Sequence, residues 1–377
     1  MIPCQRHLFD IPDEIAYFNC AYLGPQMQSV REAGYEGVDR KSHPWKVVPS
    51  HFFDESELVR DLFARLISAG ADDIAIIPSV SYGVAIAAAS IDLGAGDEII
   101  MLEEQFPSNV YPWLEVAKRT QACAVQVQRE ESETWTQAVL RRIGPATKVV
   151  TLPNVHWTDG RAIDLEQVAD KCRQVHALLV LDLTQSLGAL PFSVAAVRPA
   201  FVICAGYKWL LGPYSLGYLY VAPEFQNCSP VEHNWLNRKE SEDFAGLVDY
   251  KDDFQPGARR FDVGERSNFA LMPMALAALE QIHEWQVPAI HETLSALTGK
   301  VAHQALELGL EVSRTEERAG HMLGIRFPNG VPDGMLQNLS QENVYVSVRG
   351  NAVRISPHLH NNEADVSRLL DVMRNSL

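Results

Sequence analysis

The stretch Phe201-Val-Ile-Cys-Ala-Gly-Tyr-Lys-Trp-Leu-Leu-Gly-Pro213 decides how this chain is expected to fold. It opens with an apolar run typical of a buried strand, and Lys208 follows directly, between glycines and beside aromatic residues. A second apolar run, residues 177–182, ends on Asp182, 26 positions before the lysine. Ligands gather at the carboxyl ends of strands in a parallel sheet, so we expect Lys208 and Asp182 to face one pocket.

A lysine and an acid in one pocket are the groups that pyridoxal 5'-phosphate (PLP) chemistry uses. Lys208 can form a Schiff base, and Asp182 can keep the pyridine nitrogen protonated, so that the ring stabilises a substrate carbanion. Burial lowers the pKa of a lysine, which lets the released amine act as the proton-carrying base. Gln185, three residues beyond the acid, is expected to reach the phenolic oxygen of the ring. These residues predict a PLP site in which Lys208 and Asp182 are catalytic.

Two further segments fit this site. Ser79-Val80-Ser81 stands at a predicted strand-to-helix turn, where free backbone N–H groups and the helix dipole favour a phosphate. Arg354, in a predicted strand near the C-terminus, can bind a substrate carboxylate with two hydrogen bonds. Taken singly, the serines are more typical of a helix start and Arg354 of a structural ion pair. The order and spacing of the whole set favour the site.

The central part of the chain alternates short apolar segments with helical ones, which indicates a parallel sheet with crossover helices. This alternation predicts a fold of the α/β class. The last two central strands are expected to return around Lys208 as a hairpin, which makes the sheet mixed. The predicted strands cover residues 73–78, 97–102, 148–153, 178–182, 201–205 and 217–221, with a helix over 163–175.

The pattern changes near residues 261–269. A long helix is expected from Met272 through Trp285, broken at Pro288, and residues 301–308 are predicted as helical. Strands near 324–327, 344–348 and 353–356 and a closing helix from Glu363 complete an α+β C-terminal domain. The predicted organisation is an N-terminal segment (1–20) packed on the small domain and active site, a large cofactor-binding domain (21–270) and a small domain (271–377).

Composition places this chain of 377 residues among ordinary globular proteins, with 47% hydrophobic and 21% charged residues. A formal net charge of −16 argues against a nucleic-acid or anionic-membrane partner. The six cysteines form no CxxC pair, and His358 and His360 have no accompanying ligand cluster, so no metal site is predicted. The absence of a signal-peptide pattern and of a long apolar run favours a cytoplasmic protein.

The combination of Asp182 and Gln185 with the Gly206-Tyr-Lys-Trp209 element resembles the class V aminotransferase family of fold-type I PLP enzymes. The resemblance covers nearly the whole chain, from Tyr17-Phe-Asn-Cys-Ala-Tyr-Leu-Gly-Pro25 to Val353-Arg-Ile-Ser-Pro-His358. It implies a large domain with a mostly parallel, seven-stranded type of sheet flanked by helices, similar to that of aspartate aminotransferase. It also implies a homodimer with shared active sites.

The same resemblance assigns roles to further residues. Phe106 corresponds to the side chain that stacks on the cofactor ring, and Tyr207 replaces a histidine that helps to hold the phosphate. His156 and Trp157 fall in the loop near the phenolic oxygen and the substrate, which makes His156 a catalytic candidate and Trp157 a substrate-binding one. Asn19 is a substrate-binding candidate from the N-terminal motif.

Two departures from the family pattern matter. Where a threonine of the second subunit commonly contacts the phosphate, this chain has Glu265 and Arg266, so Ser267 or Asn268 is the expected donor. The segment 347–354 is short and has no cysteine, whereas desulfurases carry a nucleophilic cysteine there. Without a thiolate there is no persulfide chemistry, and cysteine desulfurase is excluded as a prediction.

The expected function is PLP chemistry at the α-carbon of an amino acid or related amine, with aminotransferase as the first hypothesis. A β-lyase or an amino-acid epimerase is the alternative, and an inactive cofactor-binding sensor or scaffold is a second one. A nicotinamide-dependent oxidoreductase would need a glycine-rich phosphate loop after a strand. Gly94-Ala-Gly96 precedes a strand instead and is predicted as a turn.

Overall fold

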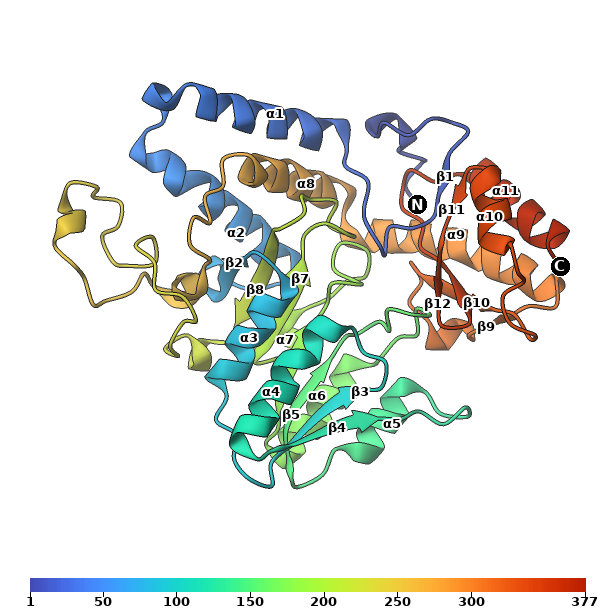
Figure 1. Cartoon of the computed structure of the whole chain (residues 1–377), viewed down its shortest axis with the longest axis horizontal. Coiled ribbons are helices and arrows are strands. Elements are labelled where there is room, and N and C mark those ends of the chain that lie inside the picture. Colours follow the sequence, from blue (N-terminus) through green and yellow to red (C-terminus); the bar gives the residue numbers. More distant parts are fainter.

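The computed structural model describes all residues, 1–377, as a large α/β domain beside a smaller α+β domain (Figure 1). The large domain contains a seven-stranded sheet in the order β2-β8-β7-β6-β5-β3-β4. All its strand pairs are parallel except those that β8 makes with β2 and β7. The bounds are β2 Ile74–Ile77, β3 Glu98–Leu102, β4 Cys123–Val127, β5 Thr147–Leu152, β6 Leu178–Asp182, β7 Phe201–Ala205 and β8 Gly217–Val221. The predicted α/β class, seven-stranded sheet and hairpin return are confirmed.

The strands alternate between two hydrophobic cores because successive side chains point to opposite faces of a sheet. In β7, Phe201 and Ile203 join one core and Val202 and Cys204 the other. Helices α3 (Val80–Ser90) and α4 (Tyr111–Thr120) cover the first face. The second face is covered by α2 (Asp54–Leu66), α5 (Trp135–Arg142), α6 (Leu165–Val175) and the start of α8 (Leu271–Trp285). Both faces are thus buried, as a parallel sheet requires.

The small domain packs α9 (Val287–Glu307), α10 (Met335–Gln341) and α11 (Glu363–Asn375) around a four-stranded antiparallel sheet. The strand order is β12-β13-β10-β9, formed by Ser347–Arg349, Ala352–Ile355, Leu323–Arg326 and Glu311–Val312. The N-terminal strand β1 (Ala16–Tyr17) pairs with β11 (Val344–Tyr345) and buries Phe18 in the same core. The N-terminal segment therefore packs on the small domain, and both chain ends lie there (Figure 1).

Some element boundaries differ from the predictions. Residues 344–348 form two strands instead of one, because Val344 and Tyr345 pair with β1 while Ser347 begins the pairing with β13. Helix α9 already begins at Val287, with Pro288 in its first turn, where proline costs no hydrogen bond. The edge strand β4 was not predicted at all.

Helix α8 lies just beyond the predicted domain boundary at residue 270. It packs against α2 and against α1 (Gln28–Ser42) of the large domain, and its residues Ala278 and Ile282 share a core with α9 residues. The helix thus joins the two domains. The exact boundary stays a prediction.

Candidate active site

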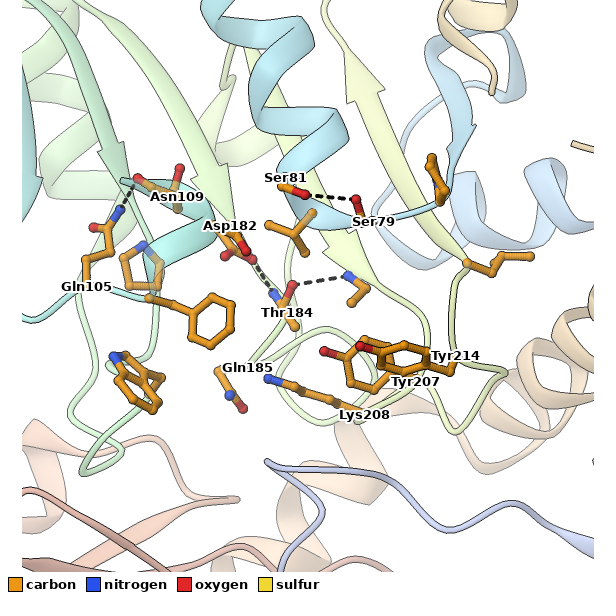
Figure 2. Close-up of a pocket in the computed structure, with 18 of the residues that line it drawn as sticks. Ser79, Ser81, Gln105, Asn109, Asp182, Thr184, Gln185, Tyr207, Lys208 and Tyr214 are labelled. Atoms are coloured by element: carbon orange, nitrogen blue, oxygen red, sulfur yellow. Dashed lines mark hydrogen bonds between the residues drawn. The ribbon is translucent and has the colours of Figure 1, made fainter. Parts of the chain in front are cut away.

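Lys208 and Asp182 come together because β6 and β7 are adjacent parallel strands. Asp182 is the last residue of β6 and pairs with Ile203 of β7, and Lys208 lies in the loop that leads from β7 to β8. Both side chains line a cavity of about 300 Å³, and both are buried, with 7% of Asp182 and 6% of Lys208 exposed (Figure 2). The predicted convergence of an amine and a carboxylate is confirmed.

The charges of the two groups depend on their burial. Burial lowers the pKa of Lys208 to about 8; Asp182 opposes this shift and Arg354 adds to it. Burial raises the pKa of Asp182, while hydrogen bonding by Thr184 and the charge of Lys208 lower it. The backbone N–H of Thr184 donates to Asp182 Oδ1 over 3.1 Å (Figure 2). The site therefore holds an amine that can be neutral near pH 8 and a carboxylate suited to a cationic partner.

The N-terminus of α3 forms one end of the cavity. Ser79 is the N-cap residue, whose Oγ accepts a hydrogen bond from the N–H of Tyr82. Ser79 Oγ also lies 3.0 Å from Ser81 Oγ (Figure 2), and Val80 lines the cavity between them. The first N–H groups of a helix lack partners within it, and the helix dipole favours an anion there. The predicted phosphate segment thus borders the same cavity as Lys208.

Aromatic side chains surround the lysine. Lys208 Nζ lies 5.4 Å from the centre of the Phe106 ring and 5.8 Å from that of Tyr207. The Tyr207 ring packs on Tyr214 with centroids 4.6 Å apart. Gln185 also lines the cavity; its Nε2 donates to Ala21 O and its Oε1 accepts from Trp209 Nε1. Phe106, Tyr207 and Gln185 are therefore within the site, as predicted.

A second cavity of about 450 Å³ shares Lys208, Phe106 and Trp157 with the first and is bordered by Arg354 from the small domain. Arg354 is 1% exposed and donates from Nη1 to Trp157 O over 2.7 Å. Its Nε and Nη2 are buried without a hydrogen-bond partner. Burial, followed by the charge of Arg349, lowers the pKa of Arg354 to about 9. A buried guanidinium with two free donors is chemically suited to a carboxylate, and substrate binding by Arg354 stays a prediction.

Other predicted residues lie outside both cavities. The His156 ring stacks on Trp135 with centroids 5.1 Å apart, and its Nδ1 lies 2.7 Å from Thr158 Oγ1. Asn19 Oδ1 accepts a hydrogen bond from Ser347 Oγ. The structure brings neither residue to the lysine. A catalytic role for His156 and a substrate contact for Asn19 thus gain no support from this geometry.

Ser267 and Asn268 border a third cavity, between α1 and the residues around Trp235, with no residue in common with the first two. Their predicted contact with phosphate was assigned to a second subunit, so within one chain it stays a prediction.

Several cavity residues escaped the sequence analysis. Thr184 follows Asp182 by two residues, donates its N–H to that carboxylate, and accepts from Ala205 N–H through Oγ1 (Figure 2). Its position directly beyond a strand-end acid was the available signal. Gln105 and Asn109 are held by local bonds after β3, including one from Gln105 Nε2 to Asn109 O, and no motif marks them. The other polar residues missed in this cavity are Ser108, Tyr214 and Ser215.

No group of three or more His, Cys, Asp or Glu side chains is arranged to hold a metal ion. None of the helices combines the length and apolarity that crossing a membrane requires.

The observed residues fit PLP. A buried carboxylate matches a protonated ring nitrogen, a lysine of lowered pKa matches an aldehyde, and the serine-capped start of α3 matches a phosphate. Asp182, Lys208 and Ser79 border a single cavity, so one small molecule can contact all three.

Comparisons with known proteins agree with this fit. Residues 31–377 match the family described as aminotransferase class-V. The uncharacterized aminotransferase YcbU of Bacillus subtilis is 25% identical, over 89% of this chain and 87% of the relative. Isopenicillin N epimerase of Streptomyces clavuligerus is 22% identical, over 83% and 82% of the two chains.

Among solved structures, a C-DES variant with glycine covalently linked to its PLP cofactor superimposes with a TM-score of 0.88 at 19% identity, covering 99% of this chain and 100% of the other. At this identity the likeness concerns the fold. The family match covers most of the sequence and carries the assignment. This chain therefore belongs to the class V aminotransferase family, whose members are PLP-dependent enzymes.

Proposed function

We propose that the protein is an aminotransferase that uses PLP and acts on an α-amino acid. The observation that carries this proposal is the guanidinium of Arg354, which borders the cavity beside Lys208 with two buried, unpartnered nitrogens, Nε and Nη2. An α-carboxylate that accepts from these donors would bring the substrate amine and α-carbon into the cavity that Lys208 lines. The position of Arg354 relative to Lys208 would thus both select an amino acid and place its α-carbon beside the lysine.

Each residue then has a distinct task. Lys208 holds the cofactor, and its released amine, with a pKa lowered to about 8, carries a proton at the substrate α-carbon. Asp182 holds the ring nitrogen in its charged form, and Ser79 and Ser81 receive the phosphate at the start of α3. The cofactor, when bound, supplies the electron sink that makes the α-carbon acidic. Phe106 and Trp157 pack edge to face, with centroids 5.6 Å apart, and shield the reacting groups from water.

The reaction type is proposed from the groups that can carry a proton. Neither cavity is lined by a histidine, cysteine or glutamate, and Asp182 is committed to the cofactor. Burial raises the pKa of Tyr207 to about 12, so that its hydroxyl keeps its proton. Lys208 is the amine that lines both cavities, and its lowered pKa allows it to accept and return a proton near neutral pH. Transamination needs one such group, whereas inversion by a two-base route needs a second and β-elimination is helped by an acid at the leaving group.

The lack of a thiol at the site argues against desulfurase chemistry. β12 and β13 are joined by only two residues, Gly350 and Asn351, and the segment 347–354 contains no cysteine. Cys20 is close to the lysine but buried, with Sγ 3.7 Å from Lys208 O, and burial raises its pKa well above the usual value. A protonated, inaccessible thiol is a poor nucleophile.

We also propose a homodimer. Exposed apolar side chains lie on the loop that follows Trp235 and Leu236 of the third cavity and projects from the large domain at the left of Figure 1. This loop includes Val248 and Tyr250, which are 79% and 96% exposed. A patch of this kind is typical of an interaction surface. A second copy seated there would bring Ser267 and Asn268 near another molecule of the same chain. The cytoplasmic location stays a prediction.

The half-reaction tests the proposed activity. Protein saturated with PLP is mixed with single amino acids and no keto-acid acceptor, and the products are identified. An aminotransferase releases up to one keto acid per subunit and stops, with the amino group retained on the cofactor. Continuous release of ammonia would identify a lyase, and inversion of the amino acid would identify an epimerase. Either result contradicts the proposal, and so does the absence of a reaction with any amino acid.

A further inference from the structure

A second arginine lies on the same face of the β12–β13 hairpin as Arg354. The register pairs Ser347 with Arg354 and Arg349 with Ala352. Directly opposed residues in an antiparallel pair point to one face, and residues two apart in a strand share that face. Arg349 and Arg354 are therefore diagonal neighbours, a relationship that places two side chains roughly 7–8 Å apart at their bases. Both line the second cavity together with Lys208.

Neither of these two cations is neutralised within the protein. No acidic side chain lies within salt-bridge distance of Arg349 or Arg354, although the three buried arginines other than Arg354 each have one: Arg6, Arg60 and Arg266. The bond that Arg349 makes is from Nη1 to the carbonyl of the adjacent Val348. No aspartate or glutamate lines the second cavity. An acidic chain, with a net charge of −16, thus keeps an unpaired cluster of positive charge at this cavity.

The Arg349 guanidinium is also held in place. Its Cζ lies 5.6 Å from the centre of the Trp157 ring, a cation–π contact. Trp157 is fixed in turn by a hydrogen bond from its Nε1 to Glu104 O, and its own carbonyl accepts from Arg354. One tryptophan therefore orders both arginines. A preorganised cation of this kind loses little freedom when it binds an anion.

These observations bear on the substrate. We propose that Arg349 binds a second carboxylate, so that the substrates are dicarboxylic: an acidic amino acid and the corresponding keto diacid. This rests on the proposed function, in which Arg354 receives the α-carboxylate. A substrate with one carboxylate would leave Arg349 unpaired beside the bound molecule. A side-chain carboxylate neutralises it and can accept from the guanidinium in bidentate fashion.

An aromatic substrate is the competing idea, because Tyr22, Phe106 and Tyr214 also line the cavity. The Phe106 ring, however, already packs edge to face against Trp157, whose ring also contacts the Arg349 guanidinium. An apolar side chain seated among these groups would desolvate Arg349 without giving it a partner, which carries a penalty. The charge of the cavity favours the diacid.

Binding of unreactive acids to the PLP-loaded enzyme tests the proposal without turnover. Glutarate and valerate have five carbons each and differ in the second carboxylate, and their dissociation constants can be measured by calorimetry. We expect glutarate to bind about 10- to 100-fold more tightly, the range that charge-assisted hydrogen bonds provide. In Arg349→Gln the ratio of the valerate and glutarate dissociation constants should fall below about twofold, because the glutamine amide is polar like the guanidinium but carries no charge.

Two further variants separate this inference from the proposed function. Arg354→Gln should weaken both acids, because each binds through its first carboxylate. Arg374→Gln, an exposed helix position paired with Asp371, is the matched control and should change neither constant. Suppose that the unaltered enzyme binds the two acids with equal affinity and that Arg354→Gln binds neither. This result would overturn the diacid proposal, while the proposed action on amino acids would still hold. If neither acid binds the unaltered enzyme, the assignment of the cavity itself fails.

A third ligand decides between carboxylate and phosphate as the second anion. 3-Phosphonopropionate carries a phosphonate in place of one carboxylate of a short diacid. Binding at least tenfold tighter than that of glutarate, and sensitive to Arg349→Gln, would overturn the carboxylate in favour of a phosphorylated substrate. Equal or weaker binding supports the dicarboxylic class.

Discussion

Lys208 Nζ lies 5.4 Å from the centre of the Phe106 ring, inside the cavity that Asp182 also borders. The lysine follows β7, the aromatic ring follows β3, and the acid ends β6, so three strands deliver these groups to one edge of the sheet. Nothing in the protein donates to or accepts from the lysine amine. The arrangement leaves that amine free to react and surrounds it with the partners that a flat, charged cofactor requires.

The amine of Lys208 should be unusually reactive near neutral pH. Its pKa, lowered to about 8 mainly by burial, means that the neutral, nucleophilic form appears above that value instead of above the ordinary 10.5. The rate of PLP capture by the cofactor-free protein should therefore rise with pH and level off above about 8. Stopped-flow absorbance measures it. A rate still rising tenfold between pH 9 and 10 would contradict the buried setting.

Arg354→Ala should impair binding of carboxylate-bearing substrates. The variant removes a guanidinium with two free buried donors, a loss of roughly 1.5–3 kcal/mol, which corresponds to about a 10- to 100-fold rise in KM for amino acids. Amines without a carboxylate should react no worse than before. Steady-state kinetics with each substrate class separate the cases. Equal losses for both classes would indicate that Arg354 is structural.

The stability of the protein should fall in mild acid because of three buried histidines. Burial lowers the pKa of His321 to about 4, of His358 to about 3 and of His360 to about 4. The folded state therefore stays unprotonated below the ordinary value of 6.5, where the unfolded chain binds protons. Stability is retained above pH 6.5 and lost as the pH falls towards 4, by up to about 1.4 kcal/mol per pH unit for each histidine.

Urea unfolding at a series of pH values checks this histidine prediction. His358→Gln should flatten the slope by close to one proton between pH 6 and 4. His303→Gln, at an exposed position, is the control and should leave the slope unchanged. If the two variants and the unaltered protein share one slope, His358 does not carry the effect.

The homodimer predicts a specific sensitivity. Val248 and Tyr250 lie on the loop that follows Trp235, and both side chains are exposed. Changing both to aspartate should leave the fold of one chain intact and, by burying two charges at the interface, release monomers. Light scattering coupled to gel filtration gives the mass. Leu306→Asp on the small domain is the control. An unaltered protein of 42.0 kDa in solution would refute the dimer.

The sequence predicted the parts of the site that depend on strand ends. Asp182 ends one apolar run and Lys208 follows the next one along the chain. Runs of this kind form buried strands of a parallel sheet, so the meeting of the two residues at one sheet edge could be foreseen. Ser79 was foreseen for a similar reason, because a serine after a strand and before an alanine-rich segment caps a helix. These inferences need only the periodicity of the elements and the rule for parallel sheets.

Side-chain directions within loops could not be foreseen. His156 and Trp157 are adjacent, yet the first stacks on Trp135 and the second lines the cavity. Their orientation depends on partners distant in sequence, such as Glu104 O for the Trp157 indole. The position of Arg349 depends on the register of the β12–β13 hairpin, in which it pairs with Ala352. The predicted strand over residues 344–348 ended before Arg349, so this register was not foreseen. Contacts between residues that are distant in the sequence decide these positions, and the local sequence pattern does not show such contacts.

The central claim is that Lys208 is the residue to which PLP is attached. It is tested most directly by reducing the PLP-loaded protein with borohydride, which fixes the imine as a stable amine, and locating the modified residue by peptide mass spectrometry. We predict one pyridoxyl group per chain, on Lys208, and none on the Lys208→Ala protein treated in the same way. A label on another lysine, or an unlabelled Lys208 in a protein that retains PLP, would contradict this account.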